Sequence, residues 1–240
     1  MNEKLLYIVL LLFLVGGMGI YFSGKRQDVS ARKKNWLKYF TYLFIVSFLY
    51  ACICFAKRFF PWVCLSITFA GLWEIIHLQR WKTRPLNITF YVTLSVYLLV
   101  SVLFMLFSSL SLSVLLFTLV TVCSFDAFCQ IAGQLFGRRK ICPQLSPNKT
   151  IEGFLGGLLM SVSVFLIVGR IINLPEYHVI VMGSGICLSA FAGDISASWI
   201  KRRYNVKDFS SALPGHGGFL DRFDSFIAAG AFVYVLNLFF

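Results

Sequence analysis

Charged side chains are scarce in this sequence of 240 residues: only 13% are charged, whereas 58% are hydrophobic. Water-soluble domains of this length rarely contain so little charge, so the composition indicates an integral membrane protein. Each membrane-spanning helix takes about 20 residues, and eight of them would use roughly 160. That arithmetic leaves no room for a separate soluble domain.

Acidic residues are particularly few. The 10 Asp and Glu stand against 22 Lys and Arg, which gives a formal net charge of +12. Such an excess can indicate a nucleic-acid-binding protein, but the basic residues of this chain lie in short loops between apolar runs. We therefore expect no nucleic-acid partner. The expected anionic partners are membrane lipid headgroups and phosphates.

Several common catalytic and metal-binding motifs are absent. The sequence has no Walker A loop, no GxGxxG and no HExxH, which argues against P-loop kinase chemistry and zinc-protease chemistry. Its seven cysteines lie mostly inside apolar stretches and show no paired spacing. We interpret them as small core residues instead of disulfide partners or metal ligands.

Apolar windows between the charged residues predict an all-α fold, a polytopic integral membrane bundle of about eight transmembrane helices. The expected spans are residues 5–22, 36–55, 59–79, 86–107, 111–136, 152–172, 178–200 and 219–239. The whole chain, 1–240, is then a single transmembrane domain whose motif-bearing half is about 111–240. We expect the first apolar segment to be a retained helix, not a signal peptide.

Basic residues are concentrated in the loops that follow the first, third, fifth and seventh expected spans. Because short loops rich in Lys and Arg stay on the cytoplasmic side of a membrane, we expect these odd-numbered loops in the cytoplasm and both termini on the opposite side. An active site built on the same loops would face the cytoplasm.

Small residues recur at four-residue spacing in the sixth expected span, at Gly153, Gly157 and Ser161. A face of this kind lets two helices approach closely. We expect it to pack against another helix of the same chain, with a homodimer contact as the alternative.

Four aspartates inside the expected spans indicate where the chemistry lies, because a carboxylate near the bilayer centre costs roughly 2.5–3.5 kcal/mol on insertion. They are Asp126, Asp194, Asp221 and Asp224. Acids that converge on one side of a bundle repel one another unless cations lie between them, so we expect a divalent metal bound by carboxylate oxygens. The alternative is that a basic residue such as Arg222 neutralises each aspartate separately.

Two polar segments precede expected spans and could bind phosphate. Residues 213–224 read LPGHGGFLDRFD, and residues 146–153 read SPNKTIEG. Three glycines in four residues let a backbone approach a ligand closely, and the N–H groups at a helix start favour anions. The second segment has capping-type residues and a lysine just before the sixth span. Either segment alone could be a simple turn.

These residues together resemble the signature of the phosphatidate cytidylyltransferases, the CDP-diacylglycerol synthases. The resemblance rests on the run 198–224, on the segment 146–153 and on the Gly193-Asp194 pair, and it covers roughly residues 124–225. The first 110 residues resemble the family only in being apolar. One departure follows Asp126, where this chain reads Ala-Phe-Cys and the family usually has a small residue and then Ala-Tyr.

The resemblance implies that CMP is transferred from CTP to phosphatidate, which yields CDP-diacylglycerol and pyrophosphate with Mg²⁺, alone or with a second cation. Expected catalytic residues are Asp194, Lys201, Asp221 and Asp224, and expected metal ligands are Asp126, Asp194, Asp221 and Asp224. The expected substrate-binding residues are Ser146, Lys149, Thr150, Arg202, Lys207, His216, Gly217, Gly218 and Arg222.

Two other functions stay open at this point. A CTP-dependent lipid kinase of the dolichol (polyprenol) or phytol type would also need a membrane site for CTP and a lipid. An ion transporter would place buried acids along an ion path.

Overall fold

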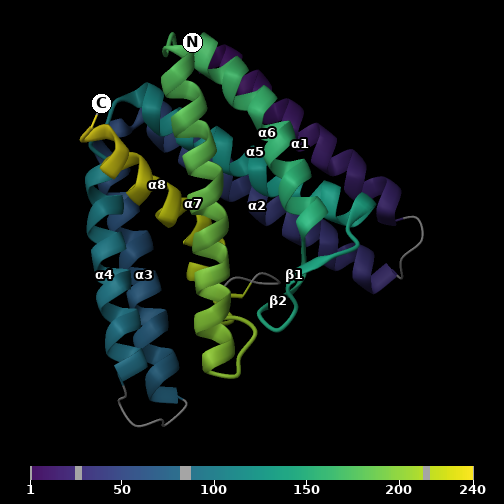
Figure 1. The fold of residues 1–240 in the computed structure, drawn as a ribbon, viewed down its shortest axis with the longest axis vertical. Helices are drawn as coiled ribbons and strands as arrows, with labels where there is room; N and C mark the ends of the chain where they lie inside the picture. The colour runs from purple at the N-terminus through teal and green to yellow at the C-terminus, as the bar shows by residue number, and fades with distance from the viewer. Residues whose placement is uncertain (1, 25–28, 82–87, 213–216, 240) are drawn as a thin grey trace.

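The computed structural model describes residues 2–24, 29–81, 88–212 and 217–239, and almost all of them are helical (Figure 1). The α-helices are α1 (Asn2–Gly24), α2 (Val29–Phe55), α3 (Phe60–Trp81), α4 (Ile88–Phe107), α5 (Leu112–Phe136), α6 (Ile151–Ile171), α7 (Glu176–Arg203) and α8 (Leu220–Asn237). A 3-10 turn, η1 (Lys57–Phe59), precedes α3, and a hairpin of β1 (Lys140–Cys142) and β2 (Ser146–Thr150) joins α5 to α6.

Each of the eight expected spans corresponds to one α-helix, with ends that agree within several residues. Among the described residues, six helical segments are long and apolar enough to cross a membrane: Asn35–Phe55, Lys57–Gln79, Ile88–Phe107, Leu112–Phe136, Ile151–Ile171 and Glu176–Arg203. Helix α1 supplies only a shorter apolar segment, Lys4–Met18, and the 18 residues of α8 include three charged ones. The multi-pass helical class is therefore confirmed, whereas eight crossings remain a prediction.

The hairpin between α5 and α6 was not expected from the sequence. Its strands are antiparallel, with Lys140 opposite Thr150 and Cys142 opposite Ser146. Thr150 ends β2 and also caps α6, because its hydroxyl accepts a hydrogen bond of 3.1 Å from the backbone N–H of Gly153. Strand β2 thus carries Lys149 directly into the start of α6.

Helices α5 and α6 pack closely along the small-residue face that the sequence contains. A Cβ on Gly153 would lie 2.9 Å from the carbonyl oxygen of Cys129, and a Cβ on Gly157 would collide with the Cys129 thiol. Ser161 is fully buried. The expectation that this face packs within the chain is confirmed, and α5 occupies the surface that a homodimer contact would need.

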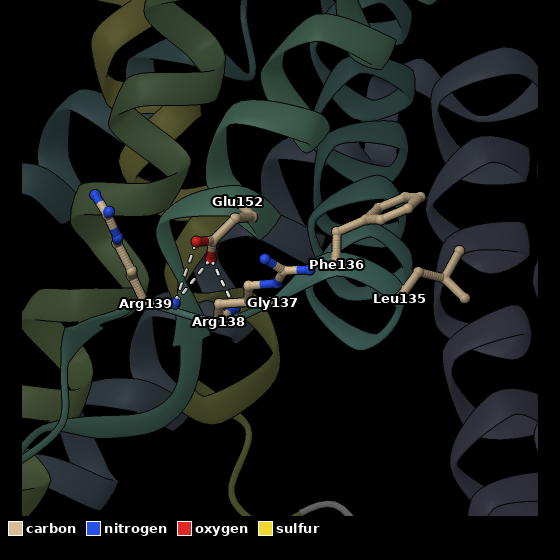
Figure 2. Close-up of a pocket in the computed structure, with 6 residues that line it drawn as sticks. All are labelled: Leu135, Phe136, Gly137, Arg138, Arg139 and Glu152. Atoms are coloured by element: carbon tan, nitrogen blue, oxygen red, sulfur yellow. Dashed lines mark hydrogen bonds between the residues drawn. The ribbon is translucent and has the colours of Figure 1, made fainter.

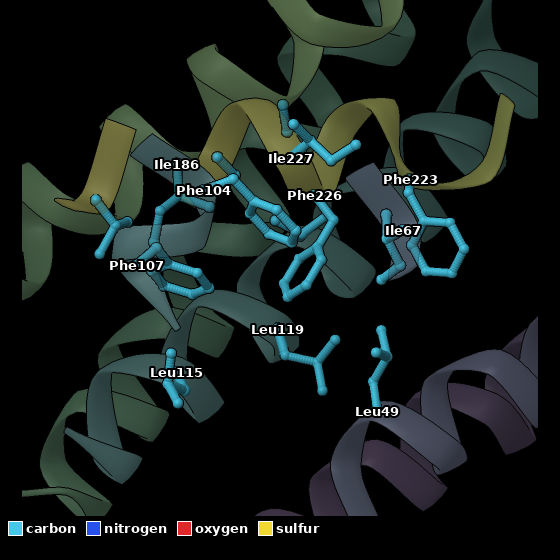
Figure 3. Packing of buried hydrophobic residues seen from close by; sticks show 14 of the residues in the cluster. Leu49, Ile67, Phe104, Phe107, Leu115, Leu119, Ile186, Phe223, Phe226 and Ile227 are labelled. Carbon is cyan, nitrogen blue, oxygen red and sulfur yellow. The ribbon is translucent and has the colours of Figure 1, made fainter. Parts of the chain in front are cut away.

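Helix α8 lies between α4 and α7, in the interior of the bundle (Figure 1). On one side, the ring of Phe226 meets Phe104 and Phe107 of α4 edge-on, at centroid distances of 5.5 and 6.0 Å (Figure 3). On the other side, a Cβ on Gly193 of α7 would lie 2.7 Å from the carbonyl oxygen of Asp224. These contacts fix the acidic start of α8 against α7.

The α5–α6 contact leads to a stability prediction. We expect Gly157→Leu to lower the Tm of the detergent-solubilised protein by several degrees, because a larger side chain forces the two helices apart at a cost of about 1–3 kcal/mol. The matched control is Ser163→Leu, a similar enlargement at an exposed position of the same helix. Equal Tm values for both variants would contradict the close α5–α6 packing.

Candidate active site

The structure brings together predicted residues from two separated parts of the chain, the hairpin and α7. The ammonium of Lys149 in β2 lies 2.6 Å from the carboxylate of Asp194 in α7, with the two side chains 19% and 37% exposed. Lys149 also lies 4.6 Å from the centre of the Phe191 ring. This pair joins the hairpin to the middle of α7, although the two residues are far apart in sequence.

Asp126, Asp194 and Asp224 converge from α5, α7 and α8. Asp126 lines a small cavity together with Arg222 and Ser225 of α8, and Gly193, the residue before Asp194, packs against the backbone carbonyl of Asp224. The carboxylate of Asp224 accepts a hydrogen bond of 2.7 Å from the backbone N–H of Ser225. Three aspartates therefore lie where α5, α7 and α8 meet, with Lys149 and Arg222 beside them.

The oxygen ligands of this region suit a divalent cation, which prefers carboxylates. Within the part of the chain that the structure describes, however, no three His, Cys, Asp or Glu side chains lie close enough to form a complete metal site. A Mg²⁺ site at Asp126, Asp194 and Asp224 is therefore a prediction from the chemistry of these residues.

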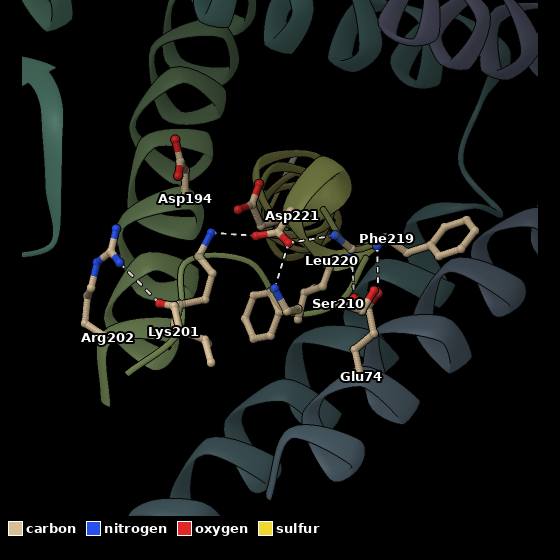
Figure 4. Close-up of polar contacts among 12 residues, drawn as sticks. Glu74, Asp194, Lys201, Arg202, Ser210, Phe219, Leu220 and Asp221 are labelled. Atoms are coloured by element: carbon tan, nitrogen blue, oxygen red, sulfur yellow. Dashed lines mark hydrogen bonds and ion pairs between the residues drawn. The ribbon is translucent and has the colours of Figure 1, made fainter. Parts of the chain in front are cut away.

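Asp221 differs from the other three aspartates, because protein groups already surround its carboxylate. The side chain is 2% exposed, and its Oδ1 lies 2.6 Å from the ammonium of Lys201 (Figure 4). Its Oδ2 accepts hydrogen bonds of 2.9 Å from the N–H of Phe209 and 2.8 Å from the N–H of Gly218. Asp221 therefore links Phe209 and Gly218, two residues of the α7–α8 connection, to Lys201 at the end of α7.

A further acid within the helices, Glu74 of α3, was missed by the sequence analysis. Its side chain is 1% exposed. Its Oε1 accepts hydrogen bonds of 2.6 Å from the Ser210 hydroxyl and 2.8 Å from the Phe219 N–H, and its Oε2 accepts one of 2.9 Å from the Leu220 N–H (Figure 4). The four aspartates were identified because each is an acid inside an apolar span. The same signal is present at Glu74.

The N–H groups at the start of α8 are consequently occupied. Those of Gly218, Phe219 and Leu220 donate to Asp221 and Glu74. The sequence predicted that such groups could seat a phosphate, but in the structure two carboxylates fill that role. The two glycines of this turn are explained by the structure itself. Gly217 has a φ of 83°, which favours glycine, and a Cβ on Gly218 would lie 2.5 Å from the Glu74 carboxylate.

Other predicted substrate-binding residues have structural partners. Arg202 donates from Nε to the carbonyl of Leu145 at 3.1 Å and from Nη1 to that of Val206 at 3.2 Å, which fastens the hairpin to α7. Thr150 caps α6 as described above. Ser146 is half-buried, and Lys207 is exposed. His216 lies outside the described residues.

Arg222 of α8 lines a small cavity of about 30 Å³ together with Tyr42, Cys123 and Asp126. Its Nε is buried and makes no hydrogen bond. The guanidinium therefore lies near Asp126 with one unpaired donor, and its binding of an anionic group stays a prediction.

A larger cavity of about 520 Å³ lies on the outer side of the turn between α5 and β1 (Figure 2). Glu152 closes this turn by accepting hydrogen bonds from the N–H groups of Arg138 at 2.9 Å and Arg139 at 3.1 Å. The cavity is lined by residues 135–139 and Glu152, and by none of the predicted catalytic residues. In Figure 2 the two arginine side chains lie on opposite sides of Glu152.

Comparison with known proteins agrees with the resemblance noted in the sequence. The profile of a cytidylyltransferase family matches residues 86–240. A phosphatidate cytidylyltransferase of Bacillus subtilis (strain 168) is 39% identical over 127 residues, which are 52% of this chain and 47% of that protein. Proteins of the same name from Staphylococcus epidermidis (strain ATCC 12228 / FDA PCI 1200) and Staphylococcus aureus (strain COL) are 44% and 42% identical over 115 residues, 47% of this chain and 44% of theirs. Each match spans less than half of the relative.

The contacts of Asp221 predict that its substitution costs stability. We expect Asp221→Asn to lower the Tm by roughly 10 °C, because Lys201 loses its buried partner at a cost of about 3–5 kcal/mol. The control is Asp208→Asn, which removes an exposed acid from the same connection and should change Tm little. Thermal unfolding in detergent measures both, and an unaltered Tm for Asp221→Asn would refute the structural role.

Proposed function

Since this chain belongs to the cytidylyltransferase family, we propose that it transfers CMP from CTP to phosphatidate, giving CDP-diacylglycerol and pyrophosphate for phospholipid biosynthesis. The observation that carries the proposal is that Asp126, Asp194 and Asp224 lie where α5, α7 and α8 meet, beside Lys149 and within the residues that match the family. The names of the curated relatives supply the substrates.

The reaction needs little proton transfer, because the phosphate of phosphatidate is already ionised near neutral pH. One of its oxygens attacks the α-phosphorus of CTP, and a new P–O bond forms. The bond from the α-phosphorus to the bridging oxygen breaks, and its electron pair leaves with pyrophosphate. What the protein must supply is alignment of two anions and neutralisation of their charge.

Basic residues around the three carboxylates suit this task. The ammonium of Lys149 faces Asp194, so it can bind a phosphate oxygen next to the acids. Arg222 has an uncommitted buried Nε beside Asp126. Lys201 is held by Asp221 and acts electrostatically on Asp224. We assign Lys149 and Arg222 to phosphate binding and Lys201 to the catalytic centre.

Mg²⁺ would be held by Asp126, Asp194 and Asp224. When bound, it would neutralise phosphate charge and assist the departure of pyrophosphate. Ligation by the fourth predicted residue, Asp221, would require Lys201 to leave its Oδ1. Without the ion, the three carboxylates would repel both anionic substrates, so a chelator should stop the reaction.

The proposed membrane topology has eight crossings, with the odd-numbered loops in the cytoplasm and both termini on the other side. The hairpin with Lys149 and the last turn of α7 with Lys201 then share the cytoplasmic side, where CTP is available. The acyl chains of phosphatidate stay in the bilayer. Membrane lipid and the two substrates are the expected partners, without nucleic acid, and a homodimer would have to use a surface other than the α5–α6 contact.

The first test follows the label of CTP. We expect purified protein to move label from α-labelled CTP into lipid when phosphatidate is present, and to lose this activity when a chelator is added. A CTP-dependent lipid kinase would transfer label only from γ-labelled CTP, and that outcome would exclude the proposal. Ion flux into liposomes without any need for CTP would instead favour a transporter.

The second test concerns Asp224, which makes few protein contacts. We expect Asp224→Asn to reduce the turnover of CTP by at least about a hundredfold, because a neutral amide cannot replace a carboxylate ligand. Its Tm should stay within a few degrees of the unaltered protein, unlike that of Asp221→Asn. Activity near the original level would remove Asp224 from the metal site.

A further inference from the structure

Glu74 lies outside residues 86–240, the part of the chain that matches the family profile. It belongs to α3, yet its hydrogen bonds reach Ser210, Phe219 and Leu220, more than 130 positions further along the chain. It thereby connects the N-terminal half of the bundle to the segment that precedes the acids of α8.

A carboxylate that is 1% exposed is stable only if other groups replace its lost hydration. Glu74 receives three donors at 2.6–2.9 Å, two of them backbone N–H groups at the start of α8. A negative charge is also favoured there by the helix dipole. These contacts fix the backbone of residues 219–220 rigidly to α3.

The residues held by Glu74 adjoin the predicted site. The N–H of Gly218 donates to Asp221, and the next two N–H groups donate to Glu74. Asp221 in turn holds Lys201 at 2.6 Å. The position of Lys201 therefore depends on how the turn of residues 217–220 is held. Glu74 accepts two hydrogen bonds from this turn and a third from Ser210 in the α7–α8 connection.

We propose that Glu74 is a positioning residue for the nucleotide: by holding the 217–220 turn against α3, it sets the geometry in which CTP binds beside Lys201 and Asp224. This inference rests on the proposed function. It assigns a role in CTP recognition to a helix that lies outside the matched part of the chain.

Glu74→Gln tests the inference with a nearly isosteric change. The amide oxygen of the glutamine can still accept hydrogen bonds from the Ser210 hydroxyl and the Phe219 N–H. Its NH₂ group, however, faces the Leu220 N–H, and because both groups are donors they repel each other. We expect the KM for CTP to rise about tenfold or more, the factor for losing one hydrogen bond to a charged group. The KM for phosphatidate should change less than twofold.

Two control variants separate positioning from general instability. Glu176→Gln removes an exposed acid paired with Arg170 at the other end of α7 and should leave both KM values unchanged. Gln79→Leu breaks the 2.6 Å hydrogen bond from Tyr204 to the same helix α3. It should lower Tm without raising the KM for CTP. If Gln79→Leu raised this KM as much as Glu74→Gln, the specific role of Glu74 would be refuted.

A second variant covers the case in which Glu74→Gln does not fold. Ser210→Ala leaves the buried carboxylate in place and removes one of its three donors. We expect a smaller rise of the KM for CTP in the same direction. An unchanged KM for CTP in each folded variant would overturn the inference.

Hydrogen exchange distinguishes failure of this inference from failure of the proposed function. In the unaltered protein the amides of Phe219 and Leu220 should exchange slowly, and in Glu74→Gln they should exchange at least about tenfold faster. If the unaltered protein transfers no CMP, the proposed function fails whatever the exchange shows. If CMP is transferred but neither the exchange nor the KM for CTP responds to Glu74→Gln, only the role of Glu74 fails.

Discussion

A carboxylate inside an apolar bundle must find donors or cations, and this requirement organises the centre of the molecule. The acids meet it in two ways. Glu74 and Asp221 are satisfied by protein groups, namely backbone N–H groups, a hydroxyl and Lys201. Asp126, Asp194 and Asp224 have fewer such partners: Asp194 pairs with Lys149, and Asp224 accepts a hydrogen bond from the N–H of Ser225. The first pair holds the scaffold together, and the second group is the one to which we assign the proposed chemistry.

Close helix contacts place these two groups side by side. The contact of Gly193 with the backbone of α8 brings Asp194 and Asp224 near each other, and the phenylalanines of α4 hold α8 from the opposite side. The hairpin adds Lys149 from a third direction, fastened by Arg202 through the carbonyl of Leu145. Several residues of the linear signature thus have an architectural task in addition to any chemical one, as Asp221 and Arg202 do.

The helices could be predicted from the sequence because apolar runs of about 20 residues between charges have few other structures in a membrane. The hairpin could not, because its strands are short and polar and its pairing depends on the position of α6. The ion pairs of Lys149 with Asp194 and of Lys201 with Asp221 depend on how separate helices meet, which no local pattern specifies. Glu74 was predictable, since a single acid inside the third span carries the same insertion cost as the aspartates.

The sequence also left open whether each aspartate would have its own basic partner. In the structure two of the four aspartates have a basic partner: Lys149 pairs with Asp194, and Lys201 pairs with Asp221. No ion pair of Asp126 or Asp224 is found within the described ranges, although Lys149, Arg222 and Lys201 act on them at longer range.

The charged start of α8 has a consequence for biogenesis. With Asp221, Arg222 and Asp224 in its first five residues, this helix partitions poorly into lipid by itself. Its partners are Glu74 on α3, Asp126 on α5 and Lys201 on α7, and all three helices emerge earlier from the ribosome. Stable integration of α8 therefore has to await the assembly of those upstream elements, so the acidic centre is completed only when the bundle that neutralises it already exists.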